Sequence, residues 1–273
     1  MTKLEYTFKT DTLFKMLFVK NPDLLKQLVC ELLGIPLESI GHFDIMNPEM
    51  PPESLGDKFC RLDINMTVDS QRVDLEIQVS DEGDYPERVL FHWAREYSSS
   101  LPSGKDYIEL PRTVIISIIN FNQLNCKEYH SEFRPLEVTR HELLSDKMSI
   151  HFFELKKLPN DLNKKNMLLL WLNLFKAETQ EEIDKIKLLG VPVMEQAINA
   201  YQSLTVSSEF KEVERLRDLA RHNEAAALRH AASQQRIEIA KNAIQMKLPI
   251  ESIVKLTGLP QDEIEKLQKI DSP

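Results

Sequence analysis

The chain has 273 residues, of which 42% are hydrophobic and 28% charged, a balance that is typical of a folded globule and excludes a disordered chain. Its formal net charge of −9 argues against a protein that holds DNA mainly through a basic surface, although bound divalent cations reverse the sign of a local field. No stretch of sequence approaches the roughly 18 apolar residues of a membrane span. Three widely separated cysteines and a charged N-terminal segment lead us to expect reduced thiols in a cytoplasmic protein.

Two amphipathic helices are predicted at the start of the chain. Thr10 and Asp11 are suited to cap the first, which places a stripe of leucine and phenylalanine on one face. The second is predicted to begin at Asn21-Pro22 and to end at Gly34. The proline-rich stretch 46–57 that follows is typical of a loop.

A β-hairpin is predicted next, because residues 61–68 and 73–79 alternate apolar and polar side chains around a short turn at Ser70-Gln71. This turn places Asn65 opposite Glu76, and Asp63 opposite Gln78. Asp63 and Glu76 are then diagonal neighbours about 7–8 Å apart on the polar face, near enough to share one Mg²⁺. Such an ion would activate water and polarise a phosphate. A hairpin with a solvated polar face shows the same alternation, so the pattern leaves both interpretations open.

A helix and a buried strand are predicted after the hairpin. The helix begins near Asp84 and runs towards Leu101, and residues 112–120 form a continuous β-branched run that is typical of a central strand covered on both faces. Residues 151–156 are predicted to form one more short strand.

Three basic side chains of the predicted helix lie on one face. Arg88, His92 and Arg95 follow each other at helical spacing. They form either a strip for the DNA backbone or a solvated surface, and the sequence does not decide between the two.

The remainder of the chain is predicted to be helical, with helices over 167–175, 181–189, 192–204, 207–247, 250–257 and 261–269. We therefore expect an α/β core in residues 1–160, a helical extension in 161–205 that packs on it, and a long helix with a helical hairpin in 206–273.

The last two predicted helices resemble a small helix-turn-helix with Gly258 at the bend. The second of them carries Asp262, Glu263 and Glu265 near its start, where a DNA-reading helix would meet phosphates of like charge. We therefore favour packing or self-association over DNA binding for this hairpin.

Four segments in order resemble one known family. Residues 10–18 (TDTLFKMLF) resemble the D-x-x-F-K-x-x-F signature of the recombination-promoting nuclease and transposase-like family, a branch of the PD-(D/E)xK nuclease superfamily. Residues 75–80 (LEIQVS) are similar to its E-x-Q strand, and residues 88–97 (RVLFHWAREY) to its R-x-L-x-Y-x-x-x-x-Y helix. Residues 104–121 (GKDYIELPRTVIISIINF) are similar to the turn and central strand that follow.

The resemblance implies an α/β fold with a restriction-endonuclease-like core, a mixed sheet flanked by helices, and an active site at the hairpin. It implies that Asp63 and Glu76 bind the metal and that Gln78 takes the place of the superfamily's lysine. Gln78 is suited to orient the attacking water, but its neutral amide cannot act as a base. Asp11 is either a further metal ligand or a helix cap, and Lys15 either contacts phosphate or lies on a solvated helix face.

The expected function is that of a DNA endonuclease with little sequence specificity, dependent on Mg²⁺ (or Mn²⁺ or Ca²⁺), and linked to recombination or mobile elements. The alternative is a nuclease fold that no longer cleaves and serves as a DNA- or protein-binding module. Neither a nucleotide cofactor nor a membrane is expected as a partner, because the sequence has no glycine-rich phosphate loop and no apolar span.

Overall fold

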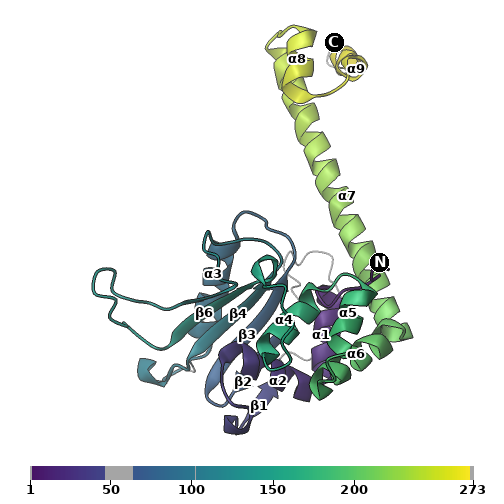
Figure 1. The fold of residues 1–273 in the computed structure, drawn as a ribbon. Helices are drawn as coiled ribbons and strands as arrows, with labels where there is room; N and C mark the ends of the chain where they lie inside the picture. Colours follow the sequence, from purple (N-terminus) through teal and green to yellow (C-terminus); the bar gives the residue numbers. More distant parts are fainter. Residues whose placement is uncertain (1, 47–63, 102, 271–273) are drawn as a thin grey trace. The chain divides into compact units, whose positions relative to one another are not determined.

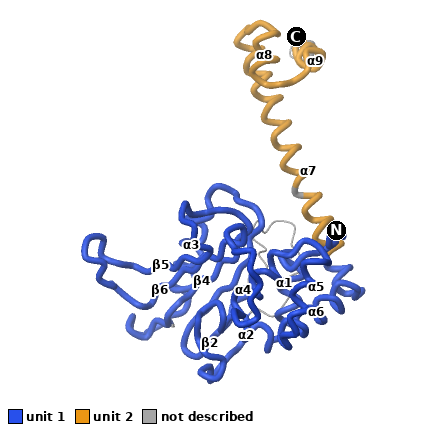
Figure 2. The backbone as a smooth tube through the Cα atoms, viewed as in Figure 1, with its two compact units in different colours: residues 1–213 blue, residues 214–273 orange. Residues whose placement is uncertain are grey.

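The computed structural model describes residues 2–46, 64–101 and 103–270. The chain divides into two compact units, residues 1–213 and 214–273 (Figure 2). The first unit holds the sheet and the helices around it, and the second holds most of the long helix α7 together with α8 and α9. A subdivision of the first unit near residue 160 stays a prediction.

The first unit is built on a sheet whose six described strands run in the order β1-β2-β3-β4-β6-β5 (Figure 1). β3, β4 and β6 are parallel neighbours, whereas β1, β2 and β5 pair antiparallel with their neighbours. The strands are β1 (Phe43–Ile45), β2 (Ile64–Val68), β3 (Gln71–Gln78), β4 (Thr113–Ile119), β5 (His130–Phe133) and β6 (Met148–Glu154). The helices are α1 (Asp11–Lys20), α2 (Pro22–Leu33), α3 (Tyr85–Ser99), α4 (Met167–Lys176), α5 (Gln180–Lys187), α6 (Pro192–Thr205), α7 (Ser208–Gln245), α8 (Ile250–Thr257) and α9 (Gln261–Ile270).

Strand β4 lies at the centre of the sheet, as its sequence predicts. Every residue from Thr113 to Ile119 is buried. β-Branched side chains fit a pleated surface that is covered on both faces, which explains why this run forms a central strand with parallel neighbours.

The two faces of the sheet are covered by different helices (Figure 1). Val73 and Leu75 of β3 belong to a large apolar cluster with side chains of α1, α2, α4, α5 and α6. On the opposite face, Tyr85 and Val89 of α3 form a smaller cluster with Ile115 of β4 and other side chains. The polar side chains of β3 alternate with Val73 and Leu75, so they lie on the face that α3 covers.

The predicted register of the β2–β3 hairpin was wrong by two residues. The turn lies at Asp69-Ser70, and Asn65 pairs with Asp74 instead of Glu76. Asp69 adopts a left-handed φ of 52°, which aspartate tolerates, and its carboxylate accepts the backbone N–H groups of Gly41 and His42 at 2.9 Å each. A shift of two residues keeps every side chain on its predicted face, because the side chains of a strand alternate with a period of two.

Two edge strands were missed by the sequence prediction, and one strand was placed too late. β1 has only three residues, and β5 (HSEF) shows no apolar alternation, so neither carries a clear signal. β6 begins at Met148 and not at His151. The sequence hides this start, because Ser149 and His151 are polar residues buried inside the strand.

The second unit confirms the predicted helical hairpin. Helix α8 spans the predicted residues, and Gly258 adopts a φ of 68° at its end, a left-handed conformation that glycine allows at little cost. Ala240, Ile253, Leu259 and Ile264 form part of its apolar core. In the part of the chain that is described, no helix combines the length and apolar character needed to cross a membrane.

A polar network joins β5 to β6 on the sheet face away from α3. His130 Nε2 lies 3.0 Å from His151 Nδ1, and the Ser149 hydroxyl lies 2.9 Å from His151 Nε2. Glu132 accepts the Ser149 hydroxyl at 2.8 Å and pairs with Arg134 at 2.6 Å. Burial lowers the pKa of His151 to about 4, with Glu132 opposing the shift and His130 adding to it.

This network predicts a loss of stability in mild acid. His151 is neutral in the native protein, whereas the unfolded chain takes up a proton at its ordinary pKa of 6.5. The contribution of neutral His151 is therefore complete above pH 6.5 and is lost as the pH falls towards about 4. Urea unfolding between about pH 7 and 5 measures the expected result: the free energy of unfolding should fall less steeply for His151→Gln than for the wild type. Equal declines would show that His151 titrates normally in the native state.

Candidate active site

The centre of the site is the carboxylate of Glu76. Strand β3 runs beside β4 in a register that pairs Glu76 with Ser117, so both side chains lie on the face covered by α3. The Ser117 hydroxyl donates to Glu76 Oε1 at 2.8 Å. Glu76 is 4% exposed, and a carboxylate buried to this extent requires polar partners.

A second hydroxyl reaches the same oxygen from helix α3. The buried Tyr85 hydroxyl donates to Glu76 Oε1 at 2.5 Å. Its ring is held by an edge contact with Phe121, with 5.5 Å between ring centroids, and by Phe152 of β6 at 5.9 Å. Burial, reinforced by the negative charge of Glu76, raises the pKa of the Tyr85 phenol well above its ordinary value, so it remains a donor.

Gln78 lies two residues beyond Glu76 on the same strand and on the same face. Its amide nitrogen donates to the backbone carbonyl of Ser80 at 2.9 Å, just after β3 ends. This bond holds the side chain at the carboxyl end of the strand. Glu76 and Gln78 thus occupy neighbouring positions, as the E-x-Q pattern predicts.

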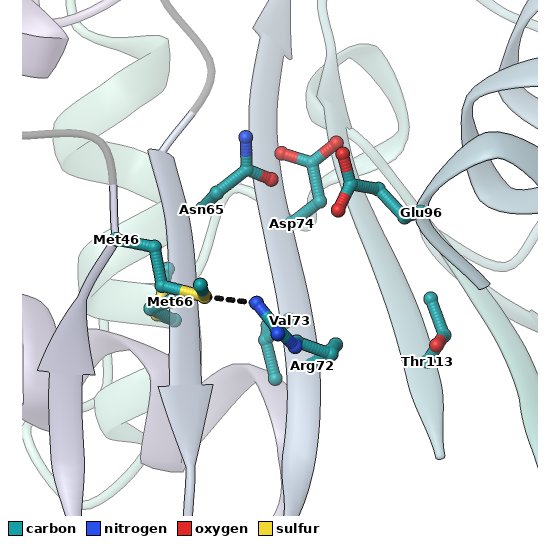
Figure 3. Close-up of a pocket in the computed structure, with 8 residues that line it drawn as sticks. All are labelled: Met46, Asn65, Met66, Arg72, Val73, Asp74, Glu96 and Thr113. Atoms are coloured by element: carbon teal, nitrogen blue, oxygen red, sulfur yellow. Dashed lines mark hydrogen bonds between the residues drawn. The ribbon is translucent and has the colours of Figure 1, made fainter. Parts of the chain in front are cut away.

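A small pocket lies on the same face, closer to the start of β3 (Figure 3). Its volume of about 10 Å³ is room for no more than about one water molecule. In Figure 3 the carboxylates of Asp74 and Glu96 point toward each other from β3 and α3, with Asn65 beside them on β2. The sequence did not single out Asp74 or Glu96.

Asp11 and Lys15 lie on α1, and most of the side chains of this helix pack in the apolar cluster on the face opposite α3. Thr10 is the residue before the helix, so Asp11 occupies its first turn and is not the N-cap. A role for Asp11 as a metal ligand stays a prediction. Lys15 is only 2% exposed, which shows that the solvated-face interpretation was wrong. A phosphate contact by Lys15 stays a prediction as well.

The three residues of the predicted basic strip on α3 differ in how far their side chains are buried. Arg88 has a side chain that is 11% exposed, pairs with Glu82, and stacks over the Tyr85 ring with 4.9 Å between Cζ and the ring centroid. His92 is half-buried, and Arg95 is exposed. Arg95 is therefore the most accessible of the three, while Arg88 packs against the residue that holds Glu76. A contact of these residues with a DNA backbone stays a prediction.

The divalent metal implied by the nuclease motifs fits the described part of the site. Glu76 offers anionic oxygen, the ligand that Mg²⁺ prefers, and hydroxyl groups orient it as partners of a metal ligand usually do. Asp63, the second predicted ligand, lies outside the described residues, so the pair stays a prediction. Among the residues that are described, no three His, Cys, Asp or Glu side chains gather as a group that could hold a metal ion.

Sequence reasoning missed Ser117 and Tyr85, although one signal was present. Ser117 is the one hydroxyl inside the apolar run VIISII, and a polar residue in a doubly covered strand requires a partner. Tyr85 carried no such signal, because its approach to Glu76 depends on how the loop before α3 returns the chain to the sheet.

Comparison with known proteins identifies one family. A family model described as "PD-(D/E)XK nuclease family transposase" matches residues 8–231. No curated protein and no solved structure matches the chain. The mixed six-stranded sheet with flanking helices and a helical C-terminal region fits the PD-(D/E)XK nuclease fold.

Proposed function

Because the chain belongs to the PD-(D/E)XK nuclease transposase family, we propose that it is a metal-dependent DNA endonuclease with little sequence specificity, linked to recombination or mobile elements. The observation that carries this proposal is the buried Glu76 carboxylate, held by two hydroxyl donors and followed on the same face by Gln78. If the polar face of the hairpin were only a solvated surface, the Glu76 carboxylate would be exposed, whereas it is buried.

Asp63 and Glu76 would hold a divalent cation, with Mg²⁺ as the physiological ion in this proposal and Asp11 as a further candidate ligand. When bound, the cation lowers the pKa of its water and offsets the charge that develops on the phosphate. Glu76 keeps its orientation through Tyr85 and Ser117. Gln78 orients the attacking water through its amide and leaves proton removal to other groups.

The acidic charge of the chain fits a nuclease that approaches DNA through its metal site. A net charge of −9 gives the chain no overall attraction for phosphates, so in this proposal local attraction comes from the cation and from exposed basic side chains such as Arg95. We also propose a cytoplasmic location, which the scattered cysteines support.

We propose self-association, and not DNA reading, for the second unit. The first turn of α9 carries Asp262 and Glu263, which would repel a DNA backbone. Leu256 on α8 is 63% exposed and offers an apolar contact to another copy.

The test of the proposed function is plasmid cleavage by the purified full-length chain. The wild type should nick plasmid DNA with Mg²⁺ or Mn²⁺ and stop when the metal is chelated. Asp63→Ala, with an unchanged melting temperature, should leave no cleavage above the buffer control. Arg140→Ala is a matched control, because Arg140 is exposed and pairs only with neighbouring glutamates in the described structure.

The alternative function, an inactive nuclease fold that binds DNA or protein, predicts a different result. Gln78 in place of lysine favours it, because the amide cannot supply a positive charge. Traces of cleavage that are equal in the wild type and Asp63→Ala would reveal a contaminant and support the binding module. In that case, gel-shift affinity for DNA would remain without turnover.

A further inference from the structure

A chain of three hydrogen bonds ties the edge strand β5 to β6. His130 Nε2 lies 3.0 Å from His151 Nδ1, and His151 Nε2 lies 2.9 Å from the Ser149 hydroxyl. The same hydroxyl lies 2.8 Å from Glu132 Oε1. His130 and Glu132 belong to β5, whereas Ser149 and His151 belong to β6. The first and the last bond therefore cross from one strand to the other.

The hydrogen atoms of this chain can point in only one direction. Burial acts to raise the pKa of Glu132, but hydrogen bonds from Ser149 and Arg134 lower it, so at neutral pH the carboxylate is ionised and can only accept. The single hydroxyl hydrogen of Ser149 therefore goes to Glu132, and the Ser149 oxygen accepts from His151 Nε2–H. Burial lowers the pKa of His151 to about 4, so its neutral ring has no second N–H, and Nδ1 accepts from His130 Nε2–H.

We infer that these four residues form a pH-sensitive latch, which holds β5 and the loop 134–147 on β6 and opens when His151 takes up a proton. That proton must bind Nδ1, which already accepts from His130, so two N–H groups would face each other at 3.0 Å. β5 is the outer strand of the described sheet, and the loop that follows it projects from the sheet (Figure 2). Release of β5 therefore exposes the edge of β6 and leaves the central strands in place.

Protonation of His130 alone leaves the latch closed. Within the described structure its Nδ1 makes no hydrogen bond, so it can take up a proton while Nε2–H still donates to His151. Burial lowers the pKa of His130, and Glu132 opposes that shift. Around His151, Glu132 favours the charged ring, whereas His130, Arg112 and Arg134 disfavour it. His151 is therefore the group that decides whether the latch opens.

Nuclear magnetic resonance of the full-length chain tests the latch without metal or DNA. At pH 7 both rings should be Nε2–H tautomers, as read from their ¹⁵N shifts. Because opening takes up a proton, the protection of β5 amides against hydrogen exchange should fall about tenfold for each pH unit below the ordinary histidine pKa of 6.5, down to about 4. Low urea should leave this local opening unchanged, whereas it should speed the exchange of β4 amides, which requires global unfolding.

His130→Phe separates the donor from the ring that carries it. Phenylalanine can keep the stacking on Phe153, where the ring centroids lie 4.3 Å apart, but it offers no N–H to His151. The pKa of His151 should therefore rise by about one unit or more, and β5 should open at correspondingly higher pH. His42→Phe is the matched control, because His42 is an exposed histidine before β1, and it should leave both values unchanged.

Three results would overturn the inference. The first is an Nδ1–H tautomer at His151 in the wild type, which would reverse the direction of the chain. The second is an unchanged His151 pKa in folded His130→Phe. The third is equal protection and equal urea dependence of the β5 and β4 amides, which would mean that the histidines act on global unfolding and hold no separate latch.

Discussion

Glu76→Gln is expected to lower metal-dependent DNA cleavage by about 10³-fold or more. The substitution removes the negative charge that would bind the cation, and a catalytic metal stabilises phosphoryl transition states by several kcal/mol. Each 1.4 kcal/mol corresponds to about tenfold in rate, so the loss of about 4 kcal/mol gives this factor.

The same substitution is expected to leave the fold almost unchanged. Glutamine has nearly the shape of glutamate, and its amide oxygen accepts the hydroxyls of Tyr85 and Ser117 in place of Oε1. The free energy of unfolding should therefore change by less than about 1 kcal/mol. The measurement is initial plasmid nicking rate together with urea unfolding of the same preparation.

Glu154→Gln is the matched control for this experiment. Glu154 is also a buried carboxylate, on β6, but it pairs with Lys157 at 2.6 Å and accepts the backbone N–H of Gln123 at 2.7 Å. Its neutralisation should lower stability by about 1.5–3 kcal/mol and leave the cleavage rate per folded molecule unchanged. Full activity of Glu76→Gln would exclude Glu76 as a metal ligand.

Trp171→Ala is expected to lower the free energy of unfolding by about 3–5 kcal/mol. Trp171 lies on α4, is fully buried, and contacts Phe18 of α1 and Phe175, with ring centroids at 6.0 and 6.5 Å. Its removal leaves a large cavity in the cluster that also holds β3 and β4. α4 should therefore unfold together with the sheet.

Trp171→Phe should lower the free energy of unfolding by less than half as much as Trp171→Ala. Within the described residues, the buried Trp171 Nε1 has no hydrogen-bond partner, so phenylalanine forfeits no bond and loses only volume. Urea unfolding measures both changes, and native-state hydrogen exchange at β4 amides shows whether the sheet shares the loss. Unchanged exchange in β4 after Trp171→Ala would mean that α4 is an independent segment.

The sequence by itself determined the elements with strong periodicity and clear boundaries. The β-branched run at 113–119 predicted a central strand, and Gly34 and Gly258 marked helix ends where a left-handed φ is required. It also determined that Glu76 and Gln78 share a face, because alternation along a strand is a local property. The ordered motifs predicted the family that the family model confirms over residues 8–231.

Only the tertiary structure decided the pairings between distant segments. The hairpin register depends on Asp69, whose carboxylate binds backbone groups near β1, and no local pattern records that contact. Lys15 is buried because several helices close over α1, although helical spacing made it look solvated. Tyr85 and Ser117 meet at Glu76 because packing brings α3 and β4 together, and long-range packing leaves no periodic trace in a single sequence.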